Sequence, residues 1–106
     1  GVASAVNNLT FTNSATGQNP ILAATGADGT IDLELAPKGA NGAVATTTYK
    51  SFGTAFASLG TPDDGTFKYC SNCTVTSGAS NVCTSGGTGA LAVRLNGAWR
   101  CFNAQN

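Results

Sequence analysis

Four cysteines constrain this chain more than any other feature, because all of them fall within residues 70–101 and the sequence contains no histidine. Cysteines without accompanying histidines favour disulfides over a zinc site, and disulfides persist in oxidising surroundings. We therefore predict two disulfides among Cys70, Cys73, Cys83 and Cys101, with a four-thiolate metal site as the weaker alternative. Three pairings are open. Cys70–Cys101 with Cys73–Cys83 is preferred over Cys70–Cys73 with Cys83–Cys101, because it would close the flexible loop and tie the first strand of this region to the last.

The clearest backbone signal lies beside the last cysteine. Two apolar segments, residues 90–95 (ALAVRL) and 98–102 (AWRCF), flank Asn96-Gly97. Asparagine and glycine reach positive φ at little cost, which a two-residue type I′ turn requires. The pattern predicts a β-hairpin here, with a strand over 66–70 and a Ser/Gly-rich loop over 73–88 before it.

The first half of the chain predicts short strands over residues 9–12, 21–25, 30–35 and 43–49, separated by turn clusters rich in Gly, Asn and Pro. In residues 30–35, Ile31, Leu33 and Leu35 alternate with two carboxylates, so one face would be buried and the other wet. Residues 52–59 have the apolar spacing of a helical face, but Gly53 weakens a helix so short, and extended or irregular structure is preferred.

The fold class that follows is all-β, with a fibre-like part over 1–60 and a cysteine-stapled β-meander over 61–106, divided at the turn 61–65 (TPDDG). More than half of the residues are Gly, Ala, Ser, Thr or Asn, so the core is small and needs disulfides or neighbouring copies. Short strands with open edges are marginal alone and stable beside identical neighbours. We expect a homo-oligomer whose assembly interface contains Leu9, Phe11, Ile31, Leu33 and Leu35.

Charge and composition argue against several functions. Five cations balance five anions without a basic run, so a nucleic-acid partner is not expected. No apolar run approaches the length of a membrane span, so membrane insertion is not expected either. The chain lacks the histidine base of a serine hydrolase. Its carboxylates lie in predicted turns and on the solvent-exposed face of a predicted strand. No enzyme activity, catalytic residue, cofactor or resident metal is expected. A redox role for Cys70-x-x-Cys73 is disfavoured because the motif follows a predicted strand.

Two stretches resemble a known group of proteins. The first comprises residues 8–20 (NLTFTNSATGQNP) and 31–39 (IDLELAPKG); the second runs through 65–73 (GTFKYCSNC) to 86–101 (GGTGALAVRLNGAWRC). Both resemble modules of bacteriophage tail-fibre and related virion-appendage proteins, over roughly three quarters of the chain. The resemblance implies an elongated, trimeric β-fibre segment at an extracellular or virion surface, in which strands from three chains share one core.

Two alternatives stay open beside a structural fibre subunit. One is a secreted filament subunit in which residues 1–12 add a strand to the open edge of the next copy. The other is a fibre tip that binds a surface glycan by stacking it on Trp99 and Tyr69, although aromatic residues on a terminal hairpin more often belong to a core or interface.

Overall fold

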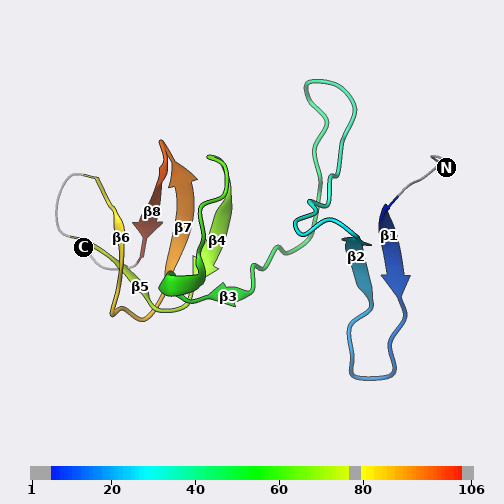
Figure 1. Ribbon diagram of the computed structural model, residues 1–106, viewed down its shortest axis with the longest axis horizontal. Coiled ribbons are helices and arrows are strands. Elements are labelled where there is room, and N and C mark those ends of the chain that lie inside the picture. Colours follow the sequence, from blue (N-terminus) through cyan, green and yellow to red (C-terminus); the bar gives the residue numbers. More distant parts are fainter. Residues whose placement is uncertain (1–5, 77–79, 104–106) are drawn as a thin grey trace. The chain divides into compact units, whose positions relative to one another are not determined.

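The computed structural model describes residues 6–76 and 80–103, which form short β-strands and one turn of 3₁₀ helix (Figure 1). The prediction of an all-β chain with two disulfides is confirmed. The chain divides into two compact units, Gly1–Thr46 and Thr47–Asn106. The division lies between Thr46 and Thr47 and not at residue 60, so residues 47–60 belong with the cysteine-bearing unit.

The first unit contains one antiparallel β-hairpin. Strand β1 (Asn7–Thr12) pairs with β2 (Ile21–Gly26) in a register that sets Leu9 opposite Ala24 and Phe11 opposite Leu22. Residues 13–20 connect the two strands, and the Ser14 hydroxyl there donates to the Asn19 carbonyl at 2.7 Å. The strands predicted over 9–12 and 21–25 are confirmed.

The strands predicted over residues 30–35 and 43–49 are wrong, because neither stretch forms a strand in the structure. Alternating side chains satisfy only one requirement of a strand; the backbone must also find a partner for its N–H and C=O groups. Neither stretch pairs with a strand of the described residues. Residues 6–46 include no buried side chain at all, so the described part of this unit has no core.

The second unit is built on a four-stranded sheet of order β3-β4-β7-β8, comprising Gly53–Thr54, Phe67–Cys70, Ala90–Leu95 and Ala98–Phe102. Strands β3 and β4 are parallel, and the other pairs are antiparallel. The β7–β8 hairpin is confirmed, with φ of 52° at Asn96 and 74° at Gly97, both positive as a type I′ turn requires. The Gly97 amide donates to Asp64 Oδ1 at 2.9 Å, which fixes this turn to the 61–65 segment.

A second layer covers one face of this sheet. It consists of the antiparallel pair β5 (Cys73–Val75) and β6 (Cys83–Ser85), together with the 3₁₀ turn η1 (Phe56–Ser58). The loop predicted over 73–88 is therefore wrong where Cys73–Val75 and Cys83–Ser85 form strands; residues 77–79 lie outside the described chain. Residues 52–59 contain both alternatives: Gly53–Thr54 are extended as preferred, whereas Phe56–Ser58 form the helical turn that was not preferred. Because β5 and β6 intervene between β4 and β7, the region is a small two-layer structure and not a simple meander.

The core of the second unit lies between the two layers. The strand register places Cys70 opposite Ala90, and Ala92 opposite Cys101, on the inner face of the sheet. The buried apolar residues are Leu59, Cys70, Cys73, Cys83, Ala90, Ala92, Trp99 and Cys101. Half of this core is cysteine, and two more members are alanine. Six of these eight residues are therefore small, and Trp99 is the largest side chain among them.

Candidate functional site

The first disulfide closes the turn between the two layers. Cys70 ends β4, Cys73 begins β5, and their Cα atoms lie 5.5 Å apart across Ser71 and Asn72. Asn72 holds the turn from both ends: its Oδ1 accepts a hydrogen bond from the Phe56 amide at 2.7 Å, and its carbonyl accepts one from the Gly87 amide at 3.0 Å. The turn is therefore anchored to η1 and to the segment before β7.

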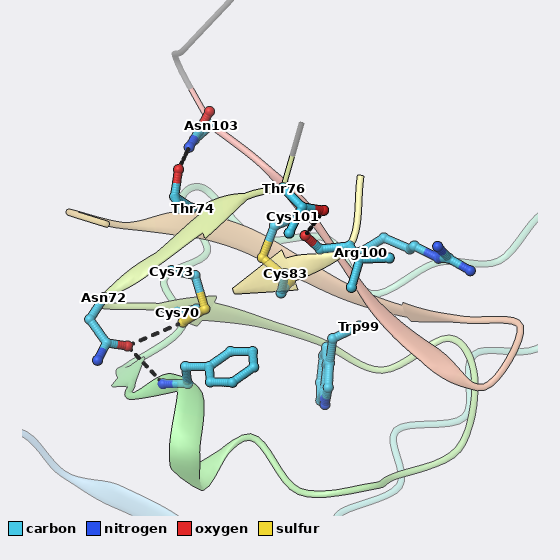
Figure 2. Close-up of a disulfide and its surroundings, with 12 residues drawn as sticks. Cys70, Asn72, Cys73, Thr74, Thr76, Cys83, Trp99, Arg100, Cys101 and Asn103 are labelled. Carbon is cyan, nitrogen blue, oxygen red and sulfur yellow. Dashed lines mark hydrogen bonds between the residues drawn. A yellow bond between two sulfur atoms is a disulfide. The ribbon is translucent and has the colours of Figure 1, made fainter. Parts of the chain in front are cut away.

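The second disulfide, Cys83–Cys101, joins β6 to β8 with a Cα separation of 4.9 Å. Figure 2 shows the two bridges near each other at the β5–β6 layer, and the register puts Trp99 on the same face of the sheet as Cys101. Each bridge connects a strand of the sheet to a strand of the covering hairpin. All four cysteines are at most 4% exposed.

The preferred pairing, Cys70–Cys101 with Cys73–Cys83, is wrong, and the alternative is the one that forms. Cys70 lies on β4 and Cys101 on β8, and β7 runs between these strands. Two strand spacings amount to roughly 9–10 Å, which exceeds the Cα separation that a disulfide spans. Cys73 and Cys83 are in neighbouring strands, but Cys73 is opposite Ser85 and Cys83 is opposite Val75, so the two cysteines are diagonal.

Trp99 is a core residue in this structure, with 8% of its surface exposed. Its Nε1 donates to the Gly60 carbonyl at 2.7 Å. The Lys68 Nζ and the Arg94 guanidinium carbon lie 6.0 and 5.9 Å from its ring centroids. The indole therefore has little free face for a ligand to stack on.

Tyr69 lies on the opposite face of the sheet from Trp99. In the strand register, Tyr69 is opposite Leu91, and Trp99 is opposite Arg94. Leu91 and Arg94 are three positions apart on β7, and side chains alternate along a strand, so these two pairs point to opposite faces. Its ring covers the backbone at two glycines, because a Cβ added to Gly89 would meet the tyrosine hydroxyl and one added to Gly53 would lie 3.6 Å from its Cδ2. The structure thus does not bring the two candidate stacking residues together.

The outer face of the sheet carries exposed apolar side chains that the sequence analysis did not single out. Phe67, Tyr69, Leu91 and Phe102 share this face and are each 42–54% exposed. Tyr49 extends the group, since its ring centroid lies 6.3 Å from that of Phe67. The alternation of side chains along residues 66–70 and 90–95 could have predicted this surface. Alternate side chains point to opposite faces of a sheet, and only one face of this sheet packs into the core.

The five predicted interface residues all belong to the first unit. Leu9 and Ile31 line one shallow hollow with Ala24, and Phe11 lines another with Leu22. Leu9 is 59% exposed and Phe11 78%. Leu33 and Leu35 are also exposed, farther along the segment that follows Ile31. Their role in assembly stays a prediction.

Two of the carboxylates that could suggest catalysis or cation binding, Asp28 and Asp64, accept hydrogen bonds from elsewhere in the fold. Asp64 accepts from the Gly97 amide, and Asp28 Oδ2 accepts from Asn7 Nδ2 at 2.7 Å. Asp28 therefore fastens the segment after β2 back onto the start of β1.

Among the described residues, no helix is long and apolar enough to cross a membrane. No protein-family model, curated protein or solved structure matches this sequence.

Proposed function

We propose that this chain is a non-enzymatic structural subunit that assembles with copies of itself into a fibre, at an extracellular or virion surface. The observation that carries the proposal is the absence of any buried side chain among residues 6–46, although this stretch contains an ordered hairpin. A two-stranded hairpin is marginally stable alone in water, and it gains stability when a third strand or another surface covers it.

The surface that would be covered is apolar and continuous along the hairpin. Because directly opposite residues lie on one face, Leu9, Phe11, Leu22 and Ala24 form the apolar hairpin face. The other face is mixed, with Asn8, Thr10, Thr12 and Thr25 beside Ile21 and Ala23. The exposed Leu9 and Phe11 offer burial worth roughly 1.5–3 kcal/mol each if a neighbour covered them fully. Ile31 borders the same face through the hollow that it shares with Leu9.

Copies of the same chain are the partner that best fits this surface. The chain carries no net charge and only 9% charged residues, so little electrostatic repulsion opposes close approach of identical molecules. Each strand of the two-stranded sheet also has one edge that pairs with no other strand in the described part of the chain. Residues 27–46 add backbone that no strand of the described residues pairs, and three copies around an axis would supply such partners.

The two disulfides are compatible with an extracellular protein. They support the proposed location, because a fibre exposed to an oxidising medium keeps such bridges. The second unit would then be the covalently stabilised part of each subunit, and the first unit the part that gains its core on assembly.

The test compares two double variants of β1. Leu9→Ser with Phe11→Ser removes the apolar side chains, whereas Thr10→Ser with Thr12→Ser makes the same number of changes on the alternate face. Light scattering coupled to size exclusion should give an oligomer, such as a trimer, for the unmodified chain and the threonine variant, and a monomer for the first variant. A monomeric unmodified chain at high concentration, or an oligomer that survives both pairs of changes, would refute the proposal.

Strand addition to the next copy is the second candidate, and the free edges of β1 and β2 favour it. Strand addition and a closed trimer differ in the mass distribution of the assembled protein. Head-to-tail addition gives open-ended polymers of many masses, whereas a closed trimer gives one mass. In the structure residues 7–12 already pair with β2 of the same chain, and residues 1–5 of the proposed donor segment lie outside the described residues. Electron microscopy of the assembled protein separates the two arrangements.

A further inference from the structure

The four cysteine sulfurs of the second unit form a single cluster. The Sγ atoms of Cys73, Cys83 and Cys101 all lie within 4.8 Å of one another. The fourth, Cys70 Sγ, is bonded to Cys73 Sγ. The four residues come from β4, β5, β6 and β8, so the cluster is the point at which the sheet and its covering layer meet (Figure 2).

This spacing is close to that of a tetrahedral thiolate site. A zinc ion binds thiolate sulfur at about 2.3 Å, so four tetrahedral ligands lie roughly 3.8 Å from one another. Cys83 Sγ and Cys101 Sγ are bonded to each other and would move apart by about 2 Å after reduction, whereas Cys73 Sγ would approach them by about 1 Å or less. Cys70 Sγ is not one of the three mutually close sulfurs, so once its bond to Cys73 is broken its side chain would also turn toward Cys83 and Cys101.

The surroundings suit a site of this kind. The cysteines are buried, so water and external thiols have little access to a bound ion. The Cys70-x-x-Cys73 turn is fixed on both sides by Asn72, and Asn72 Oδ1 lies 3.7 Å from Cys70 Sγ. Lys68 occupies the same face of the sheet as Cys101, with Ala92 between them, and its positive charge partly offsets the charge of a four-thiolate complex.

We propose that, when both disulfides are reduced, Cys70, Cys73, Cys83 and Cys101 bind one Zn²⁺ ion, which then joins the sheet to the β5–β6 layer in place of the two covalent bridges. A dithiol or phosphine reductant supplies two electrons to each disulfide and yields four thiols. Zinc binding then releases four protons as four Zn–S bonds form. This inference does not depend on the proposed fibre function.

The chemical consequence is that the same four side chains stabilise the unit in two redox environments. In a reducing compartment, where disulfides do not persist, the ion would hold the layers together. In an oxidising medium the bridges would form and the ion would leave, because a sulfur that is part of a disulfide is not a thiolate ligand.

The experiment is a metal titration of the full chain after phosphine reduction under anaerobic conditions, with Co²⁺ as the spectroscopic probe and Zn²⁺ as the competitor. One Co²⁺ per chain should bind and give the visible absorption of tetrahedral thiolate coordination, and one Zn²⁺ should displace it. Native mass spectrometry should show one zinc per chain with four fewer protons than the reduced apoprotein. The oxidised chain should bind neither metal.

Single-ligand variants distinguish a four-thiolate site from binding by the Cys70-x-x-Cys73 pair alone. Cys83→Ser and Cys101→Ser should each weaken zinc binding by more than the roughly 10–100-fold loss that follows removal of an outer-shell partner. Ser85→Ala, an exposed position on β6, is the matched control and should leave the affinity unchanged.

If reduction unfolds the chain, the test remains decisive. One equivalent of zinc should then restore dispersed amide signals in an NMR spectrum. Failure to bind Co²⁺, equal affinity in Cys83→Ser, or one metal shared between two chains would each overturn the proposal.

Discussion

Trp99 contributes at the residue scale by joining the sheet to the segment that follows η1. Its Nε1 donates to the Gly60 carbonyl, and Lys68 Nζ donates to the adjacent Leu59 carbonyl at 3.2 Å. Leu59 itself is 2% exposed. Residues 59 and 60 are thus held by two hydrogen bonds from the inner face of the sheet and by burial of one leucine.

Replacing Trp99 should therefore destabilise the second unit. Trp99→Ala is expected to cost about 3–5 kcal/mol, because the ring is the largest side chain of a small core. Trp99→Phe should cost about 1–2 kcal/mol, since it keeps an aromatic ring and leaves the Gly60 carbonyl unpaired. Urea unfolding of the oxidised chain measures both. Phe52→Ala, at an 84% exposed position, is the control and should change stability by under about 0.5 kcal/mol. A similarly small loss for Trp99→Ala would contradict its assignment to the core.

Gly89 is a second position where one residue type is required. Its φ is +134°, and a Cβ there would meet the Tyr69 hydroxyl. Gly89→Ala is expected to cost about 1–3 kcal/mol. Adding Tyr69→Phe should recover part of that loss, with a coupling of about 0.5 kcal/mol or more in a double-mutant cycle measured by urea unfolding. At Gly60, which also has positive φ but open space around it, alanine should show no coupling to Tyr69.

At the scale of elements, the two disulfides close loops of very different length. Cys70 and Cys73 are separated by 3 positions in sequence, and Cys83 and Cys101 by 18. The chain-entropy relation gives about 2 kcal/mol for the shorter loop and about 3 kcal/mol for the longer one. Replacing Cys83 and Cys101 by alanine should therefore cost more stability than replacing Cys70 and Cys73. Urea midpoints of the two double variants check this order, and the reverse order would mean that local packing dominates loop closure.

Local patterns were sufficient to predict those elements whose partner is adjacent in sequence. The Asn96-Gly97 turn carries its own conformational preference, so β7 and β8 were predictable, as were β1 and β2. Residues 30–35 alternate as clearly but have no partner strand in the described chain. The short strands β5 and β6 were hidden by Ser and Gly around them, although Cys73, Val75 and the threonines between and after them do alternate.

The sequence was sufficient to predict which residues form the disulfides, but not which cysteine pairs with which. All four cysteines were assigned to disulfides, but the pairing depends on β7 lying between β4 and β8, which is a long-range property of the sheet. The core position preferred for Trp99 is confirmed, but its hydrogen-bond partner is a long-range result, since Gly60 is 39 residues away from it. Local preferences along the chain contain no information on which distant carbonyl an indole will reach.

For the whole molecule, the division between Thr46 and Thr47 predicts that the two units differ in their ability to fold alone. A chain of residues 47–106 has its own core and both disulfides, and it should unfold cooperatively when oxidised. A chain of residues 1–46 should show collapsed amide dispersion in NMR spectra at low concentration, because none of its described residues is buried. Well-dispersed signals from a monomeric 1–46 chain would contradict this expectation.

The Cys83–Cys101 bridge also determines how a subunit would respond to tension. Pulling on the two ends of the chain transmits force from residue 83 to residue 101 through sulfur, so the intervening backbone cannot be drawn out. Reduction should lengthen the fully stretched molecule by about 60 Å, the reach of the released residues, and a single-molecule stretching experiment would detect this difference. A tethered filament made of such subunits would stay short under load in an oxidising medium and would become extensible where thiols are reduced.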